Sequence, residues 1–131
     1  MAKNYSDLTQ EEVDALIKEK VPRGADVYEI GCGGKSAVTF GEMYSQGYIN
    51  SYFGTNITKE GVLEAKEKGL DTKVVSRDYD YMPMFKALRN YGKNGVVVMF
   101  GLSEVAPDAA RKYKKQAESE GLIVAMYPKI N

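Results

Sequence analysis

The sequence alternates short apolar runs with longer segments in which apolar residues recur every three or four positions. The runs begin near residues 26, 50, 73, 95 and 122, and their β-branched and aromatic residues favour strands. The intervening segments have helical spacing, as at Ala37, Phe40 and Tyr44. One strand and one helix per repeat predict right-handed βαβ crossovers. We therefore expect a three-layer, doubly wound α/β fold with a mostly parallel sheet of about five strands.

Local signals place the ends of several elements. Thr9 and Glu12 form a capping-box pattern before an apolar stripe that continues to Val21, which predicts a leading helix. Thr58 is expected to cap a later helix, and Pro107 to open the last one. No linker, repeat or low-complexity tract interrupts the pattern. Residues 1–131 are therefore expected to form a single domain, with residues 1–22 as its leading helix.

A glycine-rich turn joins the first predicted strand to the following helix. Its sequence is Glu29-Ile-Gly31-Cys32-Gly33-Gly34-Lys35-Ser36. The glycines permit backbone angles that a side chain would forbid, and the first amides of the helix are free to bind a ligand. Doubly wound sheets bind ligands outside the carboxyl ends of the strands, where the winding reverses. We expect this turn to lie in that crevice.

Composition excludes several classes of function. Lysine plus arginine and aspartate plus glutamate are both 18, so no basic excess indicates nucleic acid or an acidic membrane. One cysteine and no histidine exclude an internal disulfide and leave almost nothing for a zinc site. The apolar runs are too short to span a bilayer, and the amino-terminal residues do not resemble a signal peptide. We expect a cytoplasmic protein without a metal.

Several strings, taken in order, resemble the class I S-adenosylmethionine-dependent methyltransferases. The glycine turn is similar to the family's first motif, and the segments around Asn56, Asp78 and Phe100 are similar to the family's later cofactor-binding motifs. The resemblance covers about residues 25 to 128. It implies a Rossmann-like domain that binds S-adenosylmethionine or S-adenosylhomocysteine and transfers a methyl group to an unknown acceptor. The cofactor-binding residues that it implies are Glu29, Gly31, Cys32, Gly33, Gly34, Lys35, Asn56, Ile57, Asp78, Tyr79 and Phe100.

The sequence departs from this family at several points. Asn56 stands where a ribose-binding carboxylate is usual, and Lys35 stands where many members have a third glycine. The chain ends after the fifth predicted strand, whereas members usually add two more. No residue is assigned a catalytic role, because the chain has no histidine and none of the strings typical of amino-group methyltransferases.

Two other functions are weighed against methyl transfer. A degenerate, non-catalytic domain could keep the fold and bind only a cofactor or a protein partner. A nucleotide phosphate could bind through Gly33 to Ser36, a string that ends like a P-loop, although Glu29 stands where that motif needs its first glycine. Glu29 could equally be a carboxylate that only organises the loop, and Cys32 a small loop residue.

The fifth predicted strand, Leu122 to Tyr127, ends four residues before the end of the sequence. In the strand order that the resemblance implies, it lies at one edge of the sheet. An open apolar edge invites another chain to pair with it. We expect a homodimer or a heteromeric partner there, or else a monomer in which the leading helix covers the gap.

Overall fold

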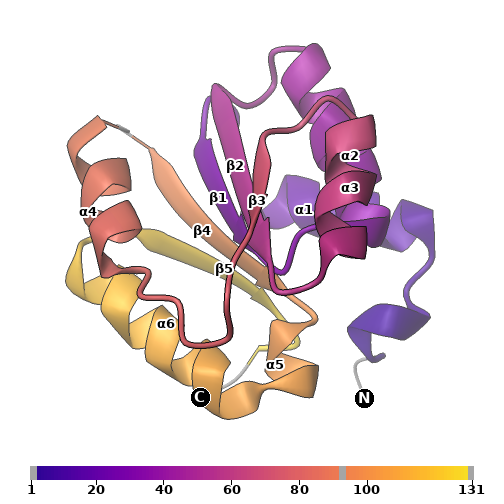
Figure 1. The fold of residues 1–131 in the computed structure, drawn as a ribbon. Helices are drawn as coiled ribbons and strands as arrows, with labels where there is room; N and C mark the ends of the chain where they lie inside the picture. The colour runs from indigo at the N-terminus through magenta and orange to yellow at the C-terminus, as the bar shows by residue number, and fades with distance from the viewer. Residues whose placement is uncertain (1–2, 92–93, 130–131) are drawn as a thin grey trace.

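The computed structural model describes residues 3–91 and 94–129 and has the expected three-layer α/β architecture (Figure 1). Five strands form one parallel sheet in the order β3-β2-β1-β4-β5. The elements follow the chain as η1 (Tyr5–Asp7), α1 (Gln10–Lys20), β1 (Asp26–Ile30), α2 (Gly34–Ser45), β2 (Ser51–Asn56), α3 (Lys59–Glu67), β3 (Thr72–Val74), α4 (Met82–Tyr91), β4 (Gly95–Phe100), α5 (Leu102–Val105), α6 (Pro107–Ser119) and β5 (Ile123–Tyr127).

The central strand β1 lies where the winding of the sheet reverses. It pairs with β2, with Asp26 opposite Ser51, and with β4, with Asp26 opposite Gly95. The three strands therefore start at one level and end at the same edge of the sheet. Because the chain leaves β1 and β4 in opposite directions across the sheet, this edge holds the crevice in which such folds bind ligands.

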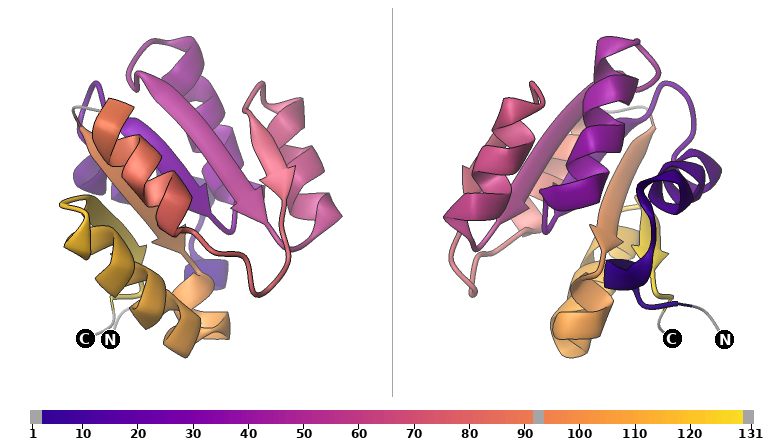
Figure 2. Two further views of the ribbon diagram at one scale, coloured as in Figure 1. Left: turned by 60° about the vertical axis from the view of Figure 1, so that its left-hand side comes forward. Right: turned by 90° about the vertical axis from the view of Figure 1, so that its right-hand side faces the viewer.

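Helices cover both faces of the sheet, as the two views in Figure 2 show. The helices α1, α2 and α3 cover one face, and α4 and α6 cover the other. Successive residues of β4 point to opposite faces: Val98 and Phe100 pack on the first side, whereas Val97 and Met99 pack on the second. All of β4 is buried, which explains its continuous apolar sequence.

The capping signals predicted from the sequence are present. Thr9 and Glu12 form a reciprocal capping box at the start of α1, and the Thr58 hydroxyl accepts from the backbone N–H of Gly61 at the start of α3. Pro107 lies in the first turn of α6. No helix in the described part of the chain is long and apolar enough to cross a membrane.

The structure differs from the predicted elements at two short helices, whereas β2 starts within one residue of its predicted position. The strand begins at Ser51, because Tyr48 still donates its backbone N–H to Met43 at the end of α2. The helices η1 and α5 were not predicted, since three and four residues are too few to show helical periodicity.

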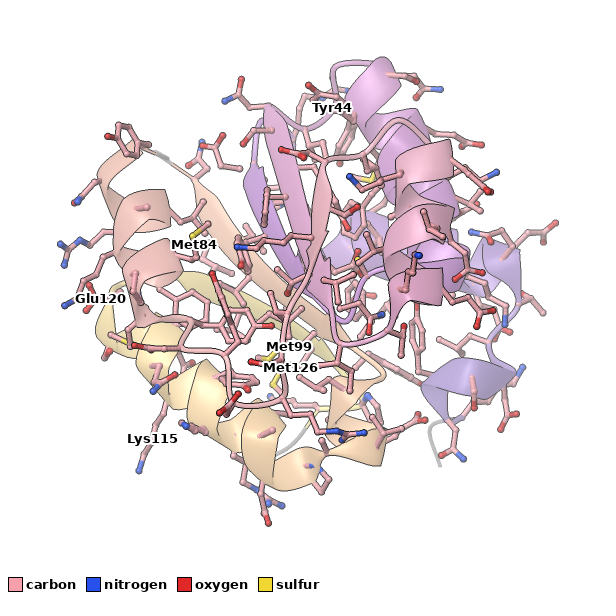
Figure 3. The ribbon with its side chains drawn as sticks, viewed as in Figure 1. Tyr44, Met84, Met99, Lys115, Glu120 and Met126 are labelled. Atoms are coloured by element: carbon pink, nitrogen blue, oxygen red, sulfur yellow. The ribbon has the colours of Figure 1, made fainter. Side chains whose placement is uncertain are left out.

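The strand β5 forms an edge of the sheet, and its one partner among the described strands is β4. Met126 lies opposite Met99 on β4, and both are buried in the core beside α6 (Figure 3). Ala125 is also buried, on the other face. Ile123, at the start of the strand, is 54% exposed.

Candidate functional site

A cavity of about 210 Å³ opens at the carboxyl ends of β1, β2 and β3, beside the point where the winding reverses. Backbone and polar groups at the strand ends form one side of it, and apolar residues of α5 and α6 form the other. Its lining residues are Ile30, Gly31, Asn56, Ile57, Ser76, Arg77, Tyr81, Leu102, Ala106, Ala109 and Tyr113.

The chain turns at Gly31 so that the loop after β1 lies against the end of β2. The backbone N–H groups of Gly31 and Cys32 both donate to the carbonyl of Thr55, at 2.8 and 3.0 Å. Gly31 has a φ of 89°, which a residue with a side chain rarely adopts. This turn brings the backbone of Gly31 to the wall of the cavity.

Asn56 ties the β1–α2 turn to the β2–α3 loop. Its Nδ2 donates to the Cys32 carbonyl at 2.6 Å, and its Oδ1 accepts from the backbone N–H of Thr58 at 3.0 Å. The amide oxygen keeps one free lone pair toward a ligand. Asn56 therefore connects two loops and keeps one N–H and one lone pair for a ligand, whereas a carboxylate would offer two acceptor oxygens to the two hydroxyls of a ribose.

Arg77 carries the only charge among the described residues that line the cavity. Its guanidinium is exposed, and no ion pair involving it is found in residues 3–91 and 94–129. The neighbouring Ser76 donates its hydroxyl to Asp78 at 2.7 Å. That hydrogen bond lowers the pKa of the Asp78 carboxyl. The rim thus presents a free cation to an anionic group.

Aromatic rings form the deep wall of the cavity. Tyr81 contacts Tyr113 edge to face at 4.8 Å between ring centroids, and its hydroxyl lies 2.9 Å from the Thr55 hydroxyl. Burial raises the pKa of Tyr81 to about 12, so the phenol is neutral at physiological pH. The wall is therefore apolar and uncharged, which suits a flat aromatic ligand group.

Glu29 lies inside the protein, beneath the glycine turn. Its side chain is fully buried, with Oε2 accepting from Ser36 Oγ and Oε1 from the Tyr52 hydroxyl, both at 2.6 Å. Burial raises the pKa of Glu29 to about 7, although both hydrogen bonds oppose the rise. Glu29 joins β1 to the first turn of α2 and does not line the cavity.

The remaining glycines of the turn pack against α3. A Cβ added to Gly33 would lie 2.7 Å from the Cα of Gly61, so the two backbones can approach only as glycines. The backbone N–H of Gly34 donates to the Glu64 carboxylate at 3.2 Å. A side chain of the protein therefore already occupies the anion-binding position at the start of α2.

Cys32 and Lys35 are both directed away from the cavity. Cys32 is buried, and burial raises the pKa of its thiol to about 12, so it is not an activated nucleophile. The Lys35 ammonium donates to the carbonyls of Ser6 and Leu8. It therefore holds the segment that precedes α1.

The sequence-predicted site residues thus fall into three groups. Gly31, Asn56 and Ile57 line the cavity, whereas Asp78 and Tyr79 belong to the loop beyond its rim. The other predicted residues pack beneath the turn or face the chain's own segments, namely Glu29, Cys32, Gly33, Gly34, Lys35 and Phe100.

Sequence reasoning missed the wall formed by α5 and α6. Of its residues Ala106, Ala109 and Tyr113, the apolar spacing of the last helix indicates only Tyr113, and it indicates a core position for that residue and not a binding surface. Arg77, in the loop after β3, was not predicted to belong to the site. Its position directly after a strand end was the available signal, because strand ends meet at the ligand-binding edge.

Comparison with known proteins shows similarity in fold to solved structures of low sequence identity. No family model matches the chain, and no curated protein does. Escherichia coli quinone oxidoreductase complexed with NADPH has a TM-score of 0.50 and 17% identity over 93% of this chain and 44% of that structure. Quinone oxidoreductase from Pseudomonas syringae pv. Tomato DC3000 has a TM-score of 0.47 and 14% identity, covering 98% of this chain and 49% of that one. The chain spans less than half of each.

These findings correct the family, function and cofactor expected from the sequence. The prediction of a methyltransferase that binds S-adenosylmethionine or S-adenosylhomocysteine is wrong, because a solved structure of similar fold is a quinone oxidoreductase in complex with NADPH. The side-chain contacts explain why the motif misled. Asn56 is engaged by the two loops, and Lys35 is engaged by the amino-terminal segment, so neither is placed as the family's pattern implied. The Rossmann-like fold itself is confirmed.

Proposed function

We propose that this chain is a nucleotide-binding domain that holds the adenosine part of an adenine nucleotide in the cavity at the ends of β1, β2 and β3. The observation that carries the proposal is the cavity itself, which combines an apolar aromatic wall with Asn56 and Arg77 at its rim. Its position beside the reversal point supports the proposal, as does the NADPH bound by the quinone oxidoreductase of similar fold.

The size of the cavity limits how much of a ligand it encloses. Cavities for drug-sized ligands measure roughly 300–1,000 Å³, whereas this one measures about 210 Å³. A base and its sugar are the part of a nucleotide that it could enclose. The base would lie against the wall of Tyr81 and Tyr113, and the ribose would lie near Asn56.

Charge favours a phosphate on the Arg77 side of the ligand. Arg77 offers donors in a planar fork that match a phosphate. At the start of α2, in contrast, Glu64 places a carboxylate against the Gly34 amide, and Ser36 and Lys35 already have partners within the chain. We therefore place the nucleotide in the cavity and not on the string from Gly33 to Ser36.

The proposal is tested by filling the cavity. Ala109→Leu adds three carbon atoms to the apolar wall, whereas Ala15→Leu makes the same change on the exposed face of α1. Calorimetric titration with adenosine 2′,5′-bisphosphate, the adenosine half of NADPH, should show binding to the parent and to Ala15→Leu. Ala109→Leu should weaken binding by about tenfold or more, since a filled cavity excludes the base. Equal affinity in all three proteins would contradict the proposal.

We also propose that two copies of the chain associate through β5. The strand leaves the hydrogen-bonding groups of its outer edge unpaired within the sheet, and the exposed Ile123 lies at its start. Pairing of identical edges about a two-fold axis would satisfy both strands equally.

A further inference from the structure

The crevice at the reversal point has a second half, between the β1–α2 turn and the β4–α5 turn, and the protein fills it with its own amino-terminal segment. Tyr5, in η1, stacks on Phe100 at the end of β4, with ring centroids 5.9 Å apart and planes 10° apart. Gly101, the first residue after β4, would place an added Cβ 3.0 Å from the Tyr5 ring. The ring therefore lies directly over the end of β4.

The backbone around Tyr5 is fixed to three different elements. The N–H of Tyr5 donates to the Glu104 carboxylate of α5. The Lys35 ammonium of α2 holds the carbonyls of Ser6 and Leu8. The Tyr127 hydroxyl, at the end of β5, donates to the carbonyl of Lys3 at 2.7 Å. We call residues Lys3 to Leu8 the strap; in Figure 2 it is the indigo segment beside the tips of β4 and β5.

We propose that the strap restricts the ligand to a single nucleoside or mononucleotide, because Tyr5 occupies the space in which the second half of a dinucleotide would lie. In a doubly wound fold a dinucleotide extends across the crevice, with one half on each side of the reversal point. Here the cavity leaves room on the side of β1, β2 and β3, whereas the side of β1 and β4 is closed by contacts of the strap. The inference rests on the nucleotide site proposed above.

The strap is held mainly by the Tyr5 ring and by backbone contacts. The Tyr5 hydroxyl is buried beside Ser36 and Glu29, in the space between the glycine turn and the end of β4. Tyr5→Phe would remove that hydroxyl and keep the stacked ring. Tyr5→Ala would remove the ring and open the space. The two substitutions therefore form a matched pair for testing occlusion.

The test compares NADPH with adenosine 2′,5′-bisphosphate by calorimetry on the full chain. If the strap excludes the second half, the two ligands should bind the parent and Tyr5→Phe with dissociation constants within about threefold of each other. In Tyr5→Ala, the dissociation constant of NADPH should fall by about tenfold relative to that of the bisphosphate, since the nicotinamide half then gains contacts. If Tyr5→Ala does not melt cooperatively, Tyr5→Val, which also removes the ring but keeps an apolar side chain against Phe100, takes its place with the same expected outcome.

Two outcomes would overturn the inference while leaving the nucleotide site intact. One is a parent protein that binds NADPH at least about tenfold more tightly than the bisphosphate. The other is a folded Tyr5→Ala or Tyr5→Val protein in which the two ligands still bind equally. Absence of binding of either ligand to the parent and to the folded variants would instead count against the nucleotide site itself.

Discussion

At the scale of single residues, Glu29 links the glycine turn to the stability of the fold. Its folded-state pKa is about 7, against an ordinary value of 4.5. Between these values the folded protein binds more protons than the unfolded chain, so the free energy of unfolding falls as pH rises. The contribution of Glu29 to the free energy of unfolding is fully present below about pH 4.5, and it is lost as the pH rises through 7. The shift corresponds to about 3 kcal/mol.

Glu29→Gln should abolish this dependence. A glutamine side chain stays neutral and can still bond to Ser36 and Tyr52, so its free energy of unfolding should vary little between pH 5 and 7. The chain has no histidine, so no other side chain has an ordinary pKa in that interval. Urea unfolding at pH 5, 6 and 7 measures the slope. Glu19→Gln, on the exposed side of α1, is the control and should keep the slope of the parent.

The same residue shows where sequence reasoning reaches its limit. The sequence placed Glu29 at the end of a strand and left open whether it bound a ligand or organised the loop. Its burial depends on Tyr52, 23 residues away, and no local pattern reports that contact. Lys35 is similar, because its partners precede α1. The sequence shows that Glu29 and Lys35 lie in the glycine turn, whereas the direction of each side chain depends on contacts with distant segments.

At the scale of elements, periodicity and capping predicted most of the fold. The long helices and the buried strands were predicted because their apolar spacing extends over several residues. The helix α5 and the strap were not predicted, since neither has a repeating pattern. Those two segments contribute Leu102 to the cavity wall and Tyr5 to the closed half of the crevice. The candidate site was therefore less predictable than the fold.

The exposed edge of β5 predicts how the chain associates. Met126 is buried within a single copy, so a charge there would destabilise the monomer whatever its partners. Ile123 is the informative position, because it is 54% exposed. Light scattering at micromolar concentration should show a dimer for the parent and a monomer for Ile123→Lys, with little change in melting temperature, since an edge lysine blocks strand pairing. Leu63→Lys, on α3 and 48% exposed, should remain dimeric. A monomeric parent would contradict the proposal.

At the scale of the whole molecule, the two sides of the sheet have different roles at the ligand-binding edge. On the side of α4 and α6 the chain leaves a cavity with an apolar wall and with Arg77, which has no ion pair among the described residues. On the side of α1, α2 and α3 it fills the space with Glu29, Lys35 and the strap. A glycine-rich turn in this fold can therefore serve the packing of the protein, while the proposed nucleotide cavity lies beside it.

The most direct test of this account is to map the bound nucleotide on the backbone by NMR. During titration with adenosine 2′,5′-bisphosphate, the amide resonances of residues that line the cavity should shift in proportion to occupancy, above all those of Gly31, Ile57, Arg77 and Ala109. The amides of Gly34 and Lys35, at the start of α2, should shift less. Shifts concentrated at Gly34 and Lys35, with the cavity residues unchanged, would contradict the account.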